Sequence, residues 1–211
     1  FSPLAQLDAS NVGRLQVAFT FSTGIDKGQE AAPIVVGNTM YIVSPFPNIL
    51  FALDLSKPGA PLKWKYEPKP LAASQGVACC DVVNRGAVYD NGKIFYNTLD
   101  AHTVAVDAET GKEIWKVKVG NINIGETTTM APLVVDTLVI VGTSGAEFGV
   151  RGHVSAFRAR DGTLAWRRYT IPSPEEGGWW GRWSDTTSWG APLHRDLARE
   201  RADSARYADS W

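Results

Sequence analysis

The sequence predicts an all-β fold, a β-propeller, from a repeat, from the composition of its strands and from the residue that ends each unit. Three segments share one layout of four short runs rich in Val, Ile, Tyr and Phe, and turn residues bound each run. Each segment ends at a tryptophan, Trp64, Trp115 and Trp166, and the interval is 51 residues both times. Four-stranded sheets that recur at about this period are typical of propeller blades. No segment carries a helical period, which excludes a solenoid of helix pairs.

The predicted blades, each of four short strands, are residues 32–66, 86–119 and 131–170. In the second blade, Asp90-Asn91-Gly92 is a strong hairpin signal. The second and third blades have matching turns before their last strand, in which Gly111 and Gly162 provide the positive φ that such turns require. We expect the tryptophan that follows each turn to pack between neighbouring sheets.

Residues 15–24 alternate like one more strand that ends in a turn, and Phe19 stands where the three tryptophans stand. We expect this segment to be the outer, closing strand of a blade whose other strands lie elsewhere in the chain. Three blades and one strand cannot close a ring of about four to eight blades, and an open ring exposes strand edges. The sequence therefore predicts that residues 1–170 are part of a longer propeller.

Residues 171–211 break the repeat and predict a Trp-rich loop or insertion that lacks the start of a further blade. The Gly- and Trp-rich loop at residues 175–183 is expected to form a lid packed over the blades, with the wall of a substrate pocket as the alternative. Residues 193–203 are highly charged and predict a short exposed helix.

The charge balance excludes some classes of partner. Lys and Arg number 21 and Asp and Glu number 22, so the net charge of −1 does not favour binding to nucleic acid or to an acidic membrane surface. No apolar run approaches the roughly 20 residues that span a bilayer, so no transmembrane segment is expected. The chain opens at Phe1 without an initiator Met, which predicts a processed or truncated N-terminus.

The only two cysteines in the sequence, Cys79 and Cys80, are adjacent. Reduced, they would act as small buried hydrophobic side chains, and the pair alone favours this reading. A disulfide between them would close a small strained ring, because adjacent Cα atoms lie about 3.8 Å apart and most bridged ones about 4.4–6.8 Å. An oxidised pair would indicate an oxidising compartment such as a periplasm. Both readings remain open at this point.

Several polar residues occupy equivalent places in the repeat, next to the innermost strands. In a propeller such positions converge around the central axis, so a carboxylate, a pair of sulfurs, a guanidinium and hydroxyls are expected to line one funnel. These residues are Glu30, then Cys79, Cys80 and Arg85, then Thr127, Thr128 and Thr129, and finally Ser144, Gly145, Ala146 and Glu147.

Two stretches carry a resemblance to a known family. GVACCDVVNRG at residues 76–86 and GTSGAEFGVRG at residues 142–152 resemble the pyrroloquinoline quinone (PQQ)-dependent alcohol dehydrogenases, the methanol/ethanol quinoprotein family. The opening residues 1–24 and the turn at residues 107–115 are similar to it as well, so the resemblance covers residues 1 to about 170. It implies an eight-bladed propeller with the quinone on its axis.

The resemblance also implies a role for each site residue. Cys79 and Cys80 would form a disulfide that stacks on the quinone, and Glu147 would bind a Ca²⁺ or lanthanide ion, since a hard cation takes carboxylate oxygen. Arg85 would pair with a cofactor carboxylate in a bidentate fork. The polar edge of the quinone would be held by Glu30, Arg85, Thr129 and Ser144, and Gly145 and Ala146 would let the backbone approach it.

The activity that the resemblance implies is oxidation of a primary alcohol to an aldehyde by hydride transfer to the quinone, in the periplasm, with a cytochrome c as electron acceptor. It is compatible with a homodimer. The catalytic Asp of the family is expected beyond Trp211, so no catalytic residue is assigned in this chain, which alone is expected to be inactive. The tail departs from the simplest methanol dehydrogenase pattern, which leaves the alcohol open. The alternative is a non-catalytic propeller scaffold of the outer-membrane assembly type, which the repeat explains and the two motifs do not.

Overall fold

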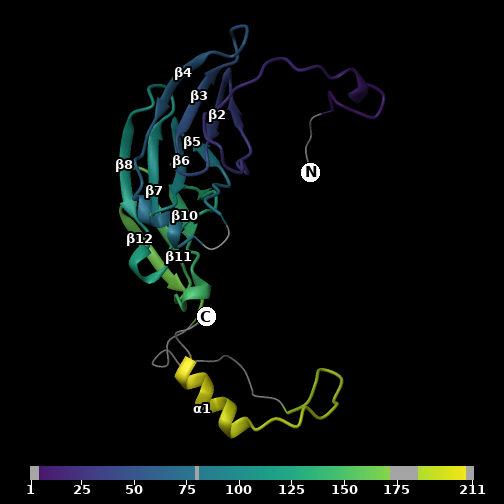
Figure 1. Cartoon of the computed structure of the whole chain (residues 1–211), viewed down its shortest axis with the longest axis vertical. Coiled ribbons are helices and arrows are strands. Elements are labelled where there is room, and N and C mark those ends of the chain that lie inside the picture. Colours follow the sequence, from purple (N-terminus) through teal and green to yellow (C-terminus); the bar gives the residue numbers. More distant parts are fainter. Residues whose placement is uncertain (1–4, 79–80, 172–184, 208–211) are drawn as a thin grey trace.

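Three four-stranded sheets form the body of the protein, seen side by side in a computed structural model that describes residues 5–78, 81–171 and 185–207 (Figure 1). All strand pairs are antiparallel, and in each sheet the spatial order follows the chain. The prediction of an all-β fold is confirmed, and each sheet lies inside one of the three predicted segments. The strands are β1 (Ile34–Val36), β2 (Thr39–Val43), β3 (Leu50–Asp54), β4 (Leu62–Tyr66), β5 (Ala87–Asp90), β6 (Lys93–Thr98), β7 (His102–Asp107), β8 (Glu113–Lys118), β9 (Leu133–Val135), β10 (Leu138–Gly142), β11 (His153–Arg158) and β12 (Leu164–Tyr169).

Short helical turns and one helix complete the described chain. The 3₁₀ turns are η1 (Val12–Arg14), η2 (Ala72–Gly76), η3 (Ile122–Ile124) and η4 (Ala146–Phe148). The helix α1 (Leu197–Tyr207) occupies the charged tail, four residues later than the predicted start at residue 193. The Asp196 carboxylate accepts a hydrogen bond from the Arg199 amide at 3.0 Å, which caps the first turn and sets this start. No helix among these residues has the length and apolar character needed to cross a membrane.

The registers repeat from blade to blade as closely as the sequence does. Ala52 pairs with Trp64, Ala105 with Trp115, and Ala156 with Trp166, and in each sheet the register shifts immediately after that alanine. Such a bulge bends the strand and strengthens its twist. The same irregularity in all three sheets shows that the blades are copies of one unit.

The core lies between successive sheets, in two clusters of buried apolar side chains. The first joins Tyr41, Leu50 and Ala52 of one blade to Ile94, Tyr96, Val104 and Val106 of the next, and the second joins Phe95, Ala105 and Trp115 to Val139, Val141 and Phe157. Removal of this apolar surface from water drives the sheets together face to face.

Tryptophan and glycine meet at each interface between blades. Trp64 lies against the turn of the second blade, where a Cβ on Gly111 would come within 2.6 Å of the indole ring. Trp115 lies in the same way against Gly162, and its Nε1 donates to the Ala159 carbonyl at 3.2 Å. These two residues confirm the predicted packing between sheets. Trp166 is 37% exposed, because no further described sheet lies beyond the third blade.

A basic side chain makes a second repeated contact between blades. Lys116 Nζ donates to the Pro68 carbonyl at 3.0 Å, and Arg167 Nη2 donates to the Val119 carbonyl at 2.6 Å. Both donors follow the tryptophan of their blade by one residue, and both carbonyls lie where the last strand of the preceding blade ends. Charge-assisted hydrogen bonds of this kind fix the rotation of one sheet relative to the next.

Residues 15–24, for which the sequence predicts an outer strand, belong to none of the three sheets, and the segment leads away from them (Figure 1). A strand is defined by hydrogen bonds to a neighbour, and none of the described strands pairs with these residues. Phe21 nevertheless packs edge-on against Phe51 at 5.2 Å between ring centroids. The Gly- and Trp-rich loop at residues 175–183 lies outside the described residues, so its two readings stay predictions.

We predict that Gly111→Ala destabilises the fold by about 3 kcal/mol, because the added methyl group both strains a left-handed residue and collides with the indole ring of Trp64. Gly59→Ala is the matched control: φ is +74° there, against +72° at Gly111, and no atom lies within 4 Å of the new methyl group. The control is expected to cost only about 1 kcal/mol. Urea unfolding of both variants measures the difference, and equal losses would contradict the proposed indole contact.

Candidate functional site

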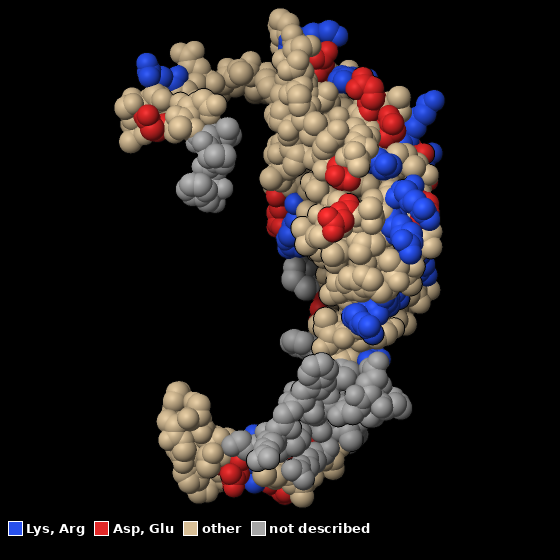
Figure 2. Space-filling model, turned by 180° about the vertical axis from the view of Figure 1, so that it is seen from behind, with Lys and Arg blue, Asp and Glu red and all other residues tan. Residues whose placement is uncertain are grey.

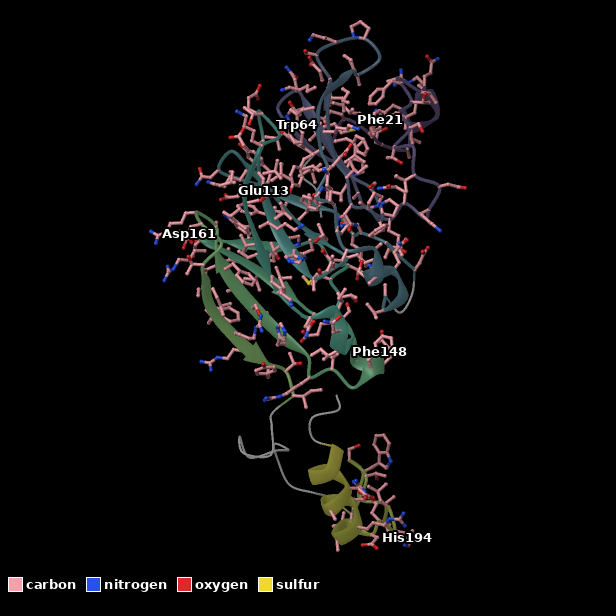
Figure 3. The ribbon with its side chains drawn as sticks, turned by 60° about the vertical axis from the view of Figure 1, so that its left-hand side comes forward. Phe21, Trp64, Glu113, Phe148, Asp161 and His194 are labelled. Carbon is pink, nitrogen blue, oxygen red and sulfur yellow. The ribbon has the colours of Figure 1, made fainter. Side chains whose placement is uncertain are left out.

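The predicted site residues that the structure describes lie at one end of the three sheets. Glu30, Arg85 and Thr129 precede the first strand of their blades, and residues 144–147 follow the second strand of the third blade. In an antiparallel sheet the start of one strand and the end of the next lie at the same edge. Figure 3 shows Phe148, in the turn after β10, and Asp161, in the turn before β12, at opposite ends of the third sheet.

Arg85 joins the three blades at this end. Its Nε lies 3.4 Å from Oε2 of Glu30, and its Nη1 donates to the Thr129 hydroxyl at 2.7 Å. The Arg85 amide also donates to the Thr129 carbonyl at 2.9 Å. The structure therefore brings together three residues that lie 55 and 44 positions apart in the sequence.

The Glu30–Arg85 pair remains open to solvent. Arg85 and Glu30 expose about half of their side chains, 49% and 48%. An ion pair this exposed contributes little to stability. A guanidinium has five N–H donors, so Arg85 can contact both partners and still bind a carboxylate of a ligand in a bidentate manner.

A buried chain of asparagines holds Arg85 and Thr129 in place. Asn84 Nδ2 donates to the Asn97 carbonyl at 2.7 Å, and Asn97 Nδ2 donates to the Met130 carbonyl at 2.9 Å. Asn84 and Asn97 are both almost fully buried. The residue before Arg85 is thus tied to the residue after Thr129. Sequence reasoning missed both asparagines, although Asn84 stands inside the 76–86 motif.

The turn at residues 144–147 packs against the segment that leads to Thr129. Ser144 and Thr127 exchange backbone hydrogen bonds of 2.9 and 3.3 Å. Gly145 has φ +127°, and a Cβ there would lie 2.4 Å from the Gly125 carbonyl oxygen, so only glycine fits. Ala146 then begins η4, which presents Glu147 at the surface.

Glu147 is an exposed carboxylate, and the described residues hold no group of three or more His, Cys, Asp or Glu side chains suited to a metal ion. In this part of the chain Glu147 therefore offers one carboxylate ligand for a hard cation rather than a complete cage. The donor set at this end is a guanidinium, two hydroxyls and two carboxylates. It fits a planar anionic ligand with carboxylate groups together with a cation.

Over the sheets as a whole, both signs of charge are interspersed (Figure 2).

Cys79 and Cys80 lie outside the described residues, and the chain before them is anchored by Asp100. The Asp100 carboxylate accepts hydrogen bonds from the Leu71 amide at 3.1 Å and from the Thr98 hydroxyl at 2.6 Å. Burial opposes ionisation of Asp100, but the hydrogen bonds from His102, Thr98 and Leu71 outweigh it and lower the pKa to about 2. Asp100 thus fixes Leu71, in the described part of the chain that precedes the cysteines.

Comparison with known proteins relates most of this chain to one family. The family model for the PQQ-type glucose/ethanol/alcohol dehydrogenase β-propeller domain matches residues 1–199. A lanthanide-dependent methanol dehydrogenase of Methylacidiphilum fumariolicum is 50% identical over 176 residues, which are 83% of this chain and 29% of the relative. Methanol dehydrogenase (cytochrome c) subunit 1 of Paracoccus denitrificans is 46% identical over 182 residues, again 83% of this chain and 29% of the relative. The chain thus spans less than a third of the length of these relatives.

Solved structures show the same relation. A europium-containing methanol dehydrogenase superposes with a TM-score of 0.79 at 50% identity and covers 83% of this chain and 30% of that chain. BamB of Moraxella catarrhalis superposes over 71% of this chain with a TM-score of 0.50 at 19% identity, which shows a shared fold alone. The prediction of a propeller is confirmed by these structural neighbours.

We predict that Asp100→Asn destabilises the protein near neutral pH and that this loss shrinks in acid. Since the pKa of Asp100 is about 2 when folded and 3.8 ordinarily, its ionised form stabilises the fold above about pH 4, and this contribution of about 2 kcal/mol is lost as the pH falls through 3.8 towards 2. Urea unfolding of wild type and variant across this range measures it. A difference between the two proteins that stays constant with pH would contradict the assignment.

Proposed function

Because the chain belongs to the PQQ-type glucose/ethanol/alcohol dehydrogenase β-propeller family, we propose that the native protein oxidises a small primary alcohol to an aldehyde with PQQ as cofactor. The observation that carries this proposal is the position of Arg85 between Glu30 and Thr129, on three successive blades, beside the turn that presents Glu147. When bound, PQQ supplies an acceptor for a hydride. Every other part of the proposal concerns what the residues of this chain do.

Arg85, Glu30 and the hydroxyls of Thr129 and Ser144 would bind the polar edge and carboxylates of the quinone. Arg85 suits this role because its fork-shaped guanidinium matches a carboxylate. The close packing of Gly145 on Gly125 places the backbone of Gly145 and Ala146 at the same edge. Cys79 and Cys80 would form the disulfide that packs on the ring face.

Glu147 would bind the cation, Ca²⁺ or a lanthanide, through its carboxylate oxygens. The lanthanide is supported by the names of relatives such as the lanthanide-dependent methanol dehydrogenase of Methylacidiphilum fumariolicum. A cation at Glu147 would act as a Lewis acid beside the quinone oxygens. Removing two electrons and two protons from the alcohol yields the aldehyde.

The electron acceptor we propose is a cytochrome c, on the basis of the name of the Paracoccus denitrificans relative. We also propose a periplasmic location, because a disulfide between Cys79 and Cys80 would form in an oxidising compartment. Methanol is the alcohol named in the relatives, and it is the first substrate to test. A non-catalytic scaffold remains the alternative that the repeat alone would allow, and it gives no role to Glu147.

We predict that Glu147→Gln weakens cation binding by the native protein at least about 10-fold, because an amide is a poorer ligand for a hard cation than a carboxylate. Titration with Eu³⁺ in the presence of PQQ, followed by lanthanide luminescence, measures the affinity. Glu109→Gln is the matched control, since Glu109 is an exposed carboxylate in the turn between β7 and β8, at the other end of its sheet. Unchanged Eu³⁺ affinity in Glu147→Gln would favour the scaffold.

We predict that Cys79 and Cys80 in the unreduced native protein do not react with iodoacetamide and that both react after reduction, because a disulfide has no thiolate to alkylate. Peptide mapping by mass spectrometry reads both positions separately. Labelling of either cysteine without reduction would exclude the disulfide, whereas the proposed roles of Arg85 and Glu147 would still stand on their own test.

A further inference from the structure

A chain of polar side chains in mutual contact adjoins the segments that hold the turn of Glu147. It begins on the linker between the second and third blades, crosses the third sheet and returns to the same linker. Its members are Glu126, His153, Ser155 and Arg167, with backbone groups of Asn121 and Val119 at the two ends. Arg167 also makes the contact with the preceding blade described above, and Lys116 makes the equivalent contact one blade earlier. Glu126, His153 and Ser155 take no part in that repeated contact.

The contacts run in sequence from one end of the chain to the other. The Asn121 amide donates to Oε2 of Glu126 at 2.6 Å, and Oε1 of Glu126 faces Nε2 of His153 at 3.4 Å. On the other side, Nδ1 of His153 lies 3.1 Å from the Ser155 hydroxyl, to which Arg167 Nε donates at 2.8 Å. Glu126 is 9% exposed and His153 is 2% exposed, so this pair is largely shielded from water, whereas Arg167 is half-buried.

The contacts on both sides of the ring favour one tautomer of His153. Arg167 Nε can only donate, so the Ser155 oxygen accepts from it, and the Ser155 hydroxyl can donate to Nδ1 of His153. On the other side, the Glu126 carboxylate can only accept, which favours a proton on Nε2. Nδ1 is then the acceptor, and the proton of the neutral ring sits on Nε2, facing Glu126. Burial, followed by the charge of Arg167, lowers the pKa of His153, which favours this neutral ring. At 3.4 Å the contact with Glu126 is an electrostatic attraction rather than a well-formed hydrogen bond, and Nε2 has no hydrogen-bond partner among the described residues.

Glu126 and His153 each adjoin a segment that holds the turn. Glu126 lies between Gly125, whose carbonyl abuts Gly145, and Thr127, which pairs with Ser144. His153 pairs with the residue before Ser144: the Thr143 amide donates to the His153 carbonyl at 3.2 Å, and the His153 amide donates to the Thr143 hydroxyl at 3.4 Å. The contact between the Glu126 and His153 side chains thus joins the two segments that pack on the turn, and we call this contact the clamp.

Stability alone is a weak reason for this arrangement. A buried carboxylate that faces a neutral ring loses hydration without gaining a full ion pair. Two packed apolar side chains in the same place are often as stable or more so. The free-energy cost of burying these polar groups has a reason if the clamp sets the geometry of the neighbouring turn.

We propose that Glu126 and His153 are positioning residues for the turn at residues 144–147, and that they hold the carboxylate of Glu147 where the cation binds. This inference rests on the function proposed for Glu147. The proposal gives this buried pair, which lies outside the motifs at residues 76–86 and 142–152, control of the affinity for the cation. Partners of this kind, which orient a ligand without touching the metal, typically change metal affinity about 10- to 100-fold when they are lost.

The test compares the Eu³⁺ affinity of the native protein with PQQ present across four variants. We expect His153→Leu to weaken binding at least about 10-fold, and His153→Gln to keep an affinity near that of wild type, because the Gln amide can donate to Glu126 from nearly the position of Nε2. The double variant Glu126→Leu/His153→Leu is expected to fold, because both polar partners are removed together, and to bind Eu³⁺ weakly. Val139→Ala, in the core of the same sheet, is the control for a general loss of stability.

The second readout is amide hydrogen exchange at Thr127 and Ser144, whose mutual hydrogen bonds report the turn directly. Faster exchange in His153→Leu and in the double variant, but not in Val139→Ala, is expected with or without the cation. Wild-type Eu³⁺ affinity in His153→Leu would overturn the proposal, as would equal weakening in Val139→Ala. Failure of the wild type itself to bind Eu³⁺ would instead overturn the function proposed for Glu147, while the exchange data would still decide whether the pair positions the turn.

Discussion

The contact on which the rest of this structure depends is the packing of a tryptophan from one blade against the turn of the next. Trp64 covers Gly111 and Trp115 covers Gly162, and in both cases the turn has no room for a side chain. The same contact recurs at both interfaces, so the third blade packs on the second as the second packs on the first. The loops at the far end of each sheet are therefore brought to one place, and Glu30, Arg85 and Thr129 meet there although none of the tryptophans touches them.

The site places its exposed groups on a rigid polar layer. Arg85 and Glu30 are half exposed and contribute little to stability. Beneath them Asn84 and Asn97 are buried, and their hydrogen bonds connect the backbone on both sides of the site. This division is what a binding site requires, since the groups that meet a ligand stay free to do so while the groups that aim them are fixed.

Much of the fold could be predicted from the sequence, because the same pattern of strands, turns and a final tryptophan occurs in all three units. The strands, the turn glycines and the burial of Trp64 and Trp115 follow from these rules. Residues 15–24 did not form the predicted strand, because alternation describes a strand's faces and says nothing about whether a partner is present. Glu30, Arg85 and Thr129 were recognisable from their place in the repeat. The roles of Asn97, Glu126 and His153 could not be predicted. A polar residue in a strand or linker is expected to be exposed, and only the packing around it shows that it is buried.

Arg85 also bears on how the blades hold together mechanically. The three described sheets pack on one another in chain order, as in an array with nearest-neighbour coupling. Arg85 takes part in both of these interfaces, because it contacts the first blade through Glu30 and the third blade through Thr129. A ligand bound to Arg85 would stabilise both interfaces, between the first and second blades and between the second and third, because its binding free energy would be lost if either one opened. With the ligand bound, the three blades would then unfold together in one cooperative transition rather than one interface at a time.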